Sequence, residues 1–219
     1  LVEELAKSDL WSCEDVLRFG IDIFITNSAL AMGFRAAQAH LGTKIHEAKD
    51  PGKHLRGMML QVAGSQFEVA RRFRDVWWGI SGVRGLPVLK AEIGAPGPPE
   101  VKVDVDNQLR VIENAVAHAP AIPGYDVRKV LADSLKLLRS GEPGLAHDTW
   151  AELVYAHLAA YMRGFRRNDV LESLYACWLT RVLSFILETR DLSSQEAEHI
   201  ILNQAKSFES KKEYLRSLL

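Results

Sequence analysis

The fold class of this chain is decided by the stretch NDVLESLYACWLTRVLSFI, residues 168 to 186. Its large apolar side chains recur every three or four residues, the spacing that places them on one face of an α-helix. Asn168 stands at the start, where its side chain can accept a hydrogen bond from a free amide of the first turn. The stretch predicts a core helix with one buried face, made of Leu171, Leu174, Trp178, Val182 and Ile186. Truncating Trp178 to Ala should then cost about 3–5 kcal/mol.

Charged residues interrupt the most apolar segment of the chain. Glu172 and Arg181 both lie between Val170 and Leu187, whereas a membrane-spanning helix needs about 20 nearly uncharged residues. We therefore expect no transmembrane segment. No basic segment followed by an apolar one opens the sequence, so no signal peptide is expected either. The two cysteines have no metal-binding spacing, which is typical of a reducing compartment, and the predicted location is cytoplasmic.

Helical signals dominate the second half of the chain. Four helices and no strand are expected after Tyr125, and one more helix is expected shortly before it. The residues expected to start these helices are Asp106, Asp126, Thr149 with Glu152, Asn168, and Ser193 with Glu196. Residues 100–219 should therefore form an all-α bundle.

The first half has a more mixed pattern. A helix is predicted from Gly20 to Gly33, a strand over Phe34–Leu41, and a long helix that begins at Asp50 and carries an apolar stripe to Val76. Gly79–Pro99 is rich in Gly and Pro, which no regular element should tolerate. The predicted organisation is an α/β-like layer over residues 1–78, a linker or loop over 79–99 and a helical domain over 100–219. The fold class is mainly α.

The overall composition excludes several classes of protein. The chain has 219 residues, of which 47% are hydrophobic, and its 27 basic and 28 acidic residues give a net charge of −1. This balance gives no overall attraction to nucleic acid, so nucleic acid is not an expected partner. The P-loop, GxGxxG, GxSxG and HExxH motifs do not occur. Nucleotide binding by a glycine loop, serine hydrolysis and a self-contained zinc site are therefore unsupported.

Two positions could carry chemistry. Asp22 falls in the first turn of a predicted helix, where the helix dipole stabilises its anion. His46 ends a predicted strand, and ligands of α/β proteins bind at the carboxyl ends of strands. From the residues alone, an ordinary first-turn acid and a structural loop histidine are the favoured readings, and the functional readings stay open beside them.

Several segments resemble a known family. The run Phe19-Gly20-Ile21-Asp22, followed by Gly33-Phe34 and by Thr43-Lys44-Ile45-His46, is similar to the late part of nucleotide-sugar glycosyltransferases with the GT-A fold, of the mannosylglycerate synthase type. The resemblance continues in the second half. Its segments there are Gly124-Tyr125-Asp126-Val127 and Tyr175-Ala176-Cys177-Trp178-Leu179-Thr180-Arg181-Val182-Leu183.

The resemblance implies roles for both candidate residues. In that family a divalent metal, Mg²⁺ or Mn²⁺, bridges the donor diphosphate to an Asp-x-Asp motif and to the histidine of Lys-x-His, so His46 would be a metal ligand. Asp22 would be the catalytic residue that orients or deprotonates the acceptor hydroxyl. No Asp-x-Asp precedes Asp22, and Asp104-Val105-Asp106 follows His46 instead. The metal is therefore expected only together with the missing N-terminal half, and this fragment alone should be inactive.

The leading hypothesis is thus the C-terminal portion of a metal-dependent glycosyltransferase, comprising the end of a GT-A layer and a helical domain. Its partners would be a nucleotide-sugar donor and a small acceptor, and an oligomer formed through the helical domain stays open. The alternative is a non-catalytic helical interaction or oligomerisation module. An Asp-x-Asp upstream in the parent gene would separate the two.

Overall fold

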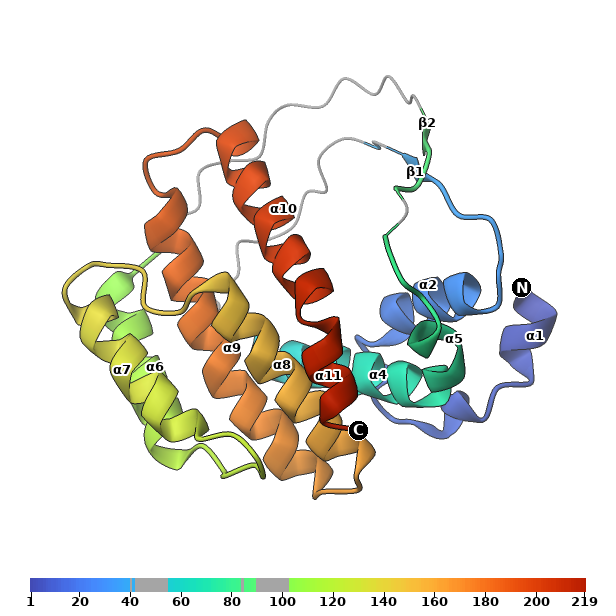
Figure 1. Cartoon of the computed structure of the whole chain (residues 1–219), viewed down its shortest axis with the longest axis horizontal. Coiled ribbons are helices and arrows are strands. Elements are labelled where there is room, and N and C mark those ends of the chain that lie inside the picture. Colours follow the sequence, from blue (N-terminus) through green and yellow to red (C-terminus); the bar gives the residue numbers. More distant parts are fainter. Residues whose placement is uncertain (40, 42–54, 84, 90–102) are drawn as a thin grey trace. The chain divides into compact units, whose positions relative to one another are not determined.

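The computed structural model of the chain is mainly helical, as the sequence predicts (Figure 1). It describes residues 1–39, 41, 55–83, 85–89 and 103–219. The chain divides into two compact units, one of residues 1–50 and 57–103 and the other of residues 51–56 and 104–219. The domain ranges 1–78, 79–99 and 100–219 stay a prediction.

The first unit combines helices with two very short strands. Its elements are α1 (Val2–Ala6), a 3-10 helix η1 (Asp9–Ser12), α2 (Ile21–Ala31), β1 (Gln38–Ala39), α4 (Arg56–Arg72), α5 (Arg74–Trp78) and β2 (Val88–Leu89). The first residue of α4, Arg56, is grouped with the second unit. The two strands pair in parallel, Gln38 opposite Val88 and Ala39 opposite Leu89.

The predicted helix from Gly20 to Gly33 is confirmed as α2. Gly20 is its N-cap residue, and Gly33 has a φ of 79°, a left-handed conformation that favours glycine. The strand predicted over Phe34–Leu41 is much shorter, since only β1 pairs. The prediction of no regular element within Gly79–Pro99 is wrong at β2. Val88 and Leu89 are neither Gly nor Pro, and they pair with β1.

One long helix was predicted up to Val76, and the structure contains two. The helix α4 ends at Arg72, Phe73 leaves helical geometry with φ −102° and ψ 28°, and α5 follows. At the break, Phe73 is partly buried and packs against the core of the unit. Val76 is exposed, contrary to the predicted stripe. The predicted start at Asp50 lies outside the described residues.

The core of the first unit is small. Five buried apolar side chains form it, and Trp11 packs edge-on against one of them, Phe24, at a ring distance of 4.9 Å. The other four are Leu5, Leu10, Val16 and Val69. The unit also leaves many large apolar side chains exposed, among them Leu17, Phe19, Ile25, Leu30, Phe34, Val76, Ile80, Val83, Val88 and Leu89.

The second unit is the predicted helical bundle. Its helices are α6 (Val105–His118), α7 (Val127–Arg139), α8 (His147–Met162), α9 (Arg167–Thr189), α10 (Ser194–Ser210) and α11 (Lys212–Ser217). The long helix α9 contacts α6, α7, α8 and α10, so it is the central element of the unit. Two of the predicted start residues are confirmed: the Asp126 side chain accepts from Lys129 N, and Ser193 forms a capping box with Glu196.

Other predicted helix starts are wrong by a few residues. The helix α6 begins at Val105 with Asp104 as its cap, so Asp106 is not the capping residue. The helices α8 and α9 begin before Thr149 and Asn168, respectively. Their N-cap residues, Ala146 and Arg166, make no side-chain hydrogen bond, so no capping side chain marks these starts in the sequence. A fifth short helix, α11, also follows Tyr125.

The predicted buried face of α9 is correct only in part. Leu171 and Leu174 are buried, but Trp178, Val182 and Ile186 are half-buried. The reason is that α9 meets neighbours on several sides, so a wider surface than one stripe is enclosed. The most deeply enclosed side chains of its second half include Leu179 and Leu183, each with 0% of its surface exposed.

By length and apolar composition, α9 could also cross a membrane. Of its most apolar window, 67% is buried inside the structure, as is usual for the core helix of a globular unit. The expectation of no membrane span stays a prediction.

Candidate functional site

Asp22 lies where the sequence predicts it, in the first turn of α2. Its carboxylate is exposed, and it makes no hydrogen bond or ion pair with any residue that the structure describes. Acidic residues are common in the first turn of a helix, where the backbone amides carry a partial positive charge. Asp22 is thus a free carboxylate at a helix start, able to accept a hydrogen bond or a proton from a bound hydroxyl.

The residue two positions earlier is fixed by close packing. Gly20 is buried, and a Cβ at this position would lie 1.8 Å from Ser65 Oγ and 2.7 Å from the Asp15 carbonyl oxygen. Its amide also donates to that carbonyl at 2.9 Å. Only glycine fits this close approach, so the backbone just before Asp22 is held by packing against α4.

Further contacts fix the rotation of α2. Phe24 is completely buried in the core of the unit, and it lies about 200° around the helix from Asp22. Two polar contacts also reach α4: Phe19 N donates to Gln61 Oε1 at 3.4 Å, and Asn27 Nδ2 donates to Gln66 Oε1 at 2.7 Å. The helix therefore presents Asp22 to the outside on a rigid support, which a positioned acid or base requires.

The other predicted site residue, His46, lies outside the described residues. Whether it shares a cleft with Asp22 stays a prediction. Within the described ranges, no group of three His, Cys, Asp or Glu side chains could hold a metal ion. These residues therefore do not form a divalent-metal site by themselves, and the predicted metal would need His46 together with carboxylates that they do not include.

A buried polar centre lies in the second unit, within the second segment that carries the family resemblance. Arg181 has 4% of its surface exposed, and it donates two hydrogen bonds to Glu188. It also donates to the Leu145 carbonyl at 2.9 Å and to Gln204 Oε1 at 2.6 Å. This one guanidinium connects α9 with α10 and with the residues that precede α8.

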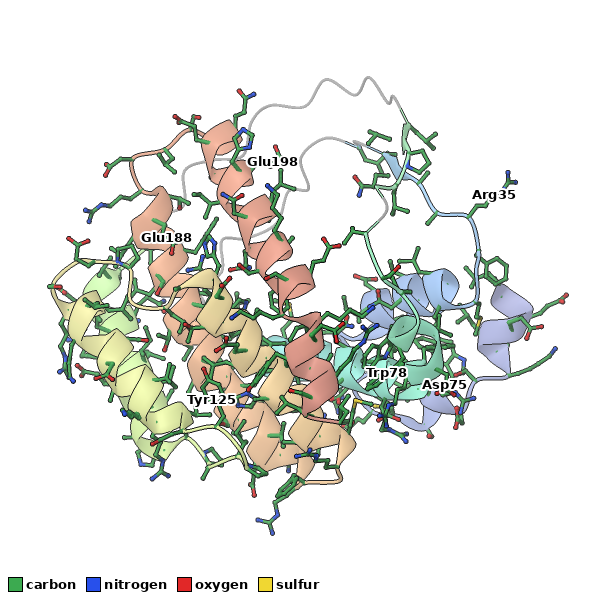
Figure 2. The ribbon with its side chains drawn as sticks, in the orientation of Figure 1. Arg35, Asp75, Trp78, Tyr125, Glu188 and Glu198 are labelled. Carbon is green, nitrogen blue, oxygen red and sulfur yellow. The ribbon has the colours of Figure 1, made fainter. Side chains whose placement is uncertain are left out.

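Glu188, labelled in Figure 2, is the acidic member of this centre. Its Oε2 lies 3.3 Å from His147 Nε2. Burial alone would raise the pKa of Glu188, but the hydrogen bonds and charges of Arg181 and His147 outweigh it and lower that pKa. The carboxylate is therefore firmly ionised and committed to Arg181, which indicates a structural role.

This centre could have been found in the sequence. Arg181 was interpreted only as an interruption of an apolar segment, yet Glu188 follows seven residues later, two helical turns along the same face. A charged residue inside a core helix needs a partner of opposite charge. No sequence pattern predicts the close approach of Ser65 to Gly20, because the two residues are distant in the sequence.

Comparison with known proteins finds no relative. No family model, no curated protein and no solved structure matches the chain.

Proposed function

We propose that the chain is the C-terminal portion of a metal-dependent glycosyltransferase, which transfers a sugar from a nucleotide-diphosphate sugar to a hydroxyl of a small acceptor. The proposal rests on the Phe-Gly-Ile-Asp segment, in which Gly20 and Asp22 have different roles. Gly20 is required by the contact with Ser65, while Asp22 is exposed, unpaired among the described residues and held on a fixed helix start.

The two-stranded sheet also supports the proposal. Parallel sheets in α/β proteins are usually larger and are covered on both faces. All four residues of β1 and β2 are exposed, and the strands are only two residues long. Strands this short and exposed would fit at the edge of a larger α/β layer. The many exposed apolar side chains of the first unit have the same explanation, since such a layer would cover them.

The chemistry that Asp22 would perform follows from its surroundings. An attacking hydroxyl must lose its proton as the bond to the sugar forms, and an exposed carboxylate can accept that proton. Asp22 would hold the hydroxyl by a hydrogen bond before the transfer and keep the proton afterwards. A bound Mg²⁺ or Mn²⁺, with His46 among its ligands, would neutralise the charge of the leaving diphosphate.

The test uses the full-length protein that contains this chain, with donor affinity and transfer rate measured for each variant. Asp22→Asn preserves shape but cannot take up the proton, so donor affinity should stay unchanged while the transfer rate falls by about 10²–10⁴-fold. His46→Ala should instead abolish the metal-dependent turnover of the donor.

Matched controls separate these roles from general damage. Asp75, labelled in Figure 2, is also an exposed aspartate in a first helical turn, and Asp75→Asn should transfer at the wild-type rate. His199→Ala on exposed α10 is the control for His46→Ala. Wild-type transfer by Asp22→Asn would refute the role of Asp22. A full-length protein that turns over no nucleotide sugar would refute the glycosyltransferase proposal and favour the helical interaction module.

A further inference from the structure

A cleft of about 530 Å³ lies in the second unit, with α6 and α9 forming its walls. This volume is typical of small-molecule sites. One wall presents Arg110, Asn114 and His118, which are spaced by four residues and share one face of α6. The other wall presents Glu172 and Tyr175 of α9. Arg56, which is grouped with this unit, completes the lining.

Hydrogen-bond donors without partners are concentrated in this cleft. Among the described residues, nothing pairs with the Arg110 guanidinium, the Asn114 carboxamide or the Tyr175 hydroxyl. Only 6% of the Tyr175 surface is exposed, but its hydroxyl is not one of the buried polar atoms that lack a partner, so the hydroxyl reaches solvent. A ligand at the open side of the cleft can therefore accept a hydrogen bond from it.

The remaining polar side chains are held in place. Arg56 forms an ion pair with Glu172, and its guanidinium lies 5.8 Å from the centre of the Tyr175 ring. Trp178 stacks on the same ring at 6.0 Å, so the tyrosine cannot turn freely. His118 donates Nδ1–H to the Asn114 carbonyl at 2.8 Å, so Nε2 of the neutral ring is a hydrogen-bond acceptor.

The charge of the side chains that line the cleft favours an anionic ligand. Glu172 is the only acidic group among the described lining residues, and Arg56 pairs with it, so Arg110 has no acidic partner in that lining. Arg128 donates two hydrogen bonds to the Ala119 carbonyl at the end of α6, at 3.0 Å and 2.9 Å. A helix C-terminus would otherwise repel an anion. Among the described lining residues, the cleft thus combines one unpaired cation, Arg110, with two neutral donors, Asn114 and Tyr175.

We propose that this cleft binds the phosphate group of a small phosphorylated metabolite. Arg110 and the Tyr175 hydroxyl would donate to the phosphate oxygens, since the planar arginine fork matches phosphate geometry. Asn114 would complete the donor set along α6. The volume exceeds that of a phosphate ion, which leaves room for an organic part of about the size of a sugar. The site is independent of the proposed transferase activity.

The experiment is calorimetric titration of the 219-residue chain with two probes, inorganic phosphate and glucose 6-phosphate. We expect saturable binding with the sugar phosphate bound more tightly than phosphate. Arg110→Gln should weaken the binding of both probes by about tenfold or more, and Tyr175→Phe, which keeps the ring contacts, by about three- to tenfold.

Arg163→Gln is the matched control, because Arg163 is exposed at the end of α8 and has no side-chain partner among the described residues. Its affinity for both probes should equal that of the wild type. The proposal is overturned if the wild-type chain shows no saturable binding up to about 10 mM probe. It is overturned equally if Arg110→Gln and Arg163→Gln bind alike, since the attraction would then be a general charge effect. Unchanged circular dichroism of the variants confirms that they are folded.

Discussion

Arg181 and Glu188 lie two turns apart on α9 and are joined by two hydrogen bonds, Nη1 to Oε1 and Nη2 to Oε2, each 2.7 Å long. This fork arrangement is the strongest form of an arginine–carboxylate contact. Because Arg181 is almost fully enclosed, its charge depends on this single acidic partner. The pair is therefore the point at which one substitution should disturb the helical unit most.

Glu188→Gln should destabilise the second unit by about 3–5 kcal/mol, because it leaves the guanidinium of Arg181 buried without a counter-charge. Urea unfolding followed by circular dichroism measures the loss. Asp191→Asn is the control, since it removes the partner of exposed Arg190 and should change the stability by no more than about 0.5 kcal/mol. Equal losses of stability in the two variants would show that the buried pair contributes no more to stability than the exposed pair.

His157 should make the stability depend on pH. It is completely buried, Nδ1 donates to the Leu153 carbonyl at 2.6 Å, and burial lowers its pKa from 6.5 to about 4 despite that hydrogen bond. Between these two values the unfolded chain binds the extra proton and the folded chain does not. Stability is therefore complete above about pH 6.5 and declines as the pH falls toward about 4, by a total on the order of 3 kcal/mol.

The measurement for His157 is urea unfolding at about pH 7 and at about pH 5, where the wild type should lose on the order of 2 kcal/mol. His157→Leu should remove most of this difference, because the buried titrating group is absent. The exposed His199 provides the control, and His199→Leu should keep the full difference. A pH dependence that survives in His157→Leu would assign it to other groups.

Gly20→Ala should destabilise the first unit by about 1–3 kcal/mol, because the new methyl group overlaps Ser65 Oγ. Adding Ser65→Gly should recover part of the loss, although the Asp15 carbonyl still crowds the position. Gly57→Ala is the matched control, because no heavy atom lies within 4 Å of its new Cβ in α4. It should stabilise the helix by about 0.5–1 kcal/mol, and a tolerated Gly20→Ala would contradict the packing argument.

Trp178→Ala should cost less than the sequence alone suggests. The side chain is half-buried, so the expected loss is about 1–3 kcal/mol rather than that of a fully enclosed tryptophan. Leu179→Ala, one residue further along α9, removes a side chain with 0% exposure and should cost about 3–5 kcal/mol. Chemical unfolding measures the loss of stability in both variants. A larger loss for Trp178→Ala than for Leu179→Ala would contradict the assignment of the buried face.

Mn²⁺ should bind the 219-residue chain only weakly, because the described residues form no set of three ligands and one imidazole cannot hold a hard divalent cation. Calorimetric titration with MnCl₂ tests this expectation, with His46→Ala beside the wild type. Micromolar binding that His46→Ala removes would show that the chain contains a complete metal site.

The sequence by itself determined the features that depend on neighbours along the chain. Asp126 and Ser193 bond to amides three residues away, so a local pattern is enough to predict where α7 and α10 begin. The same holds for the start of α2 after Gly20 and for its left-handed end at Gly33. Asp22 was correctly placed in a first turn for this reason, whereas its chemical role comes only from the family resemblance.

Only the tertiary structure decided the features that join distant segments. Ser65 excludes a side chain at Gly20, Phe73 packs against the core at the break after α4, and α9 is enclosed on several sides rather than along one stripe. The donors of Arg110 and Tyr175 likewise meet in one cleft only after α6 packs on α9. Helix periodicity states which residues share a face of one helix, but the neighbours of that face are set by packing between segments that sequence spacing does not relate.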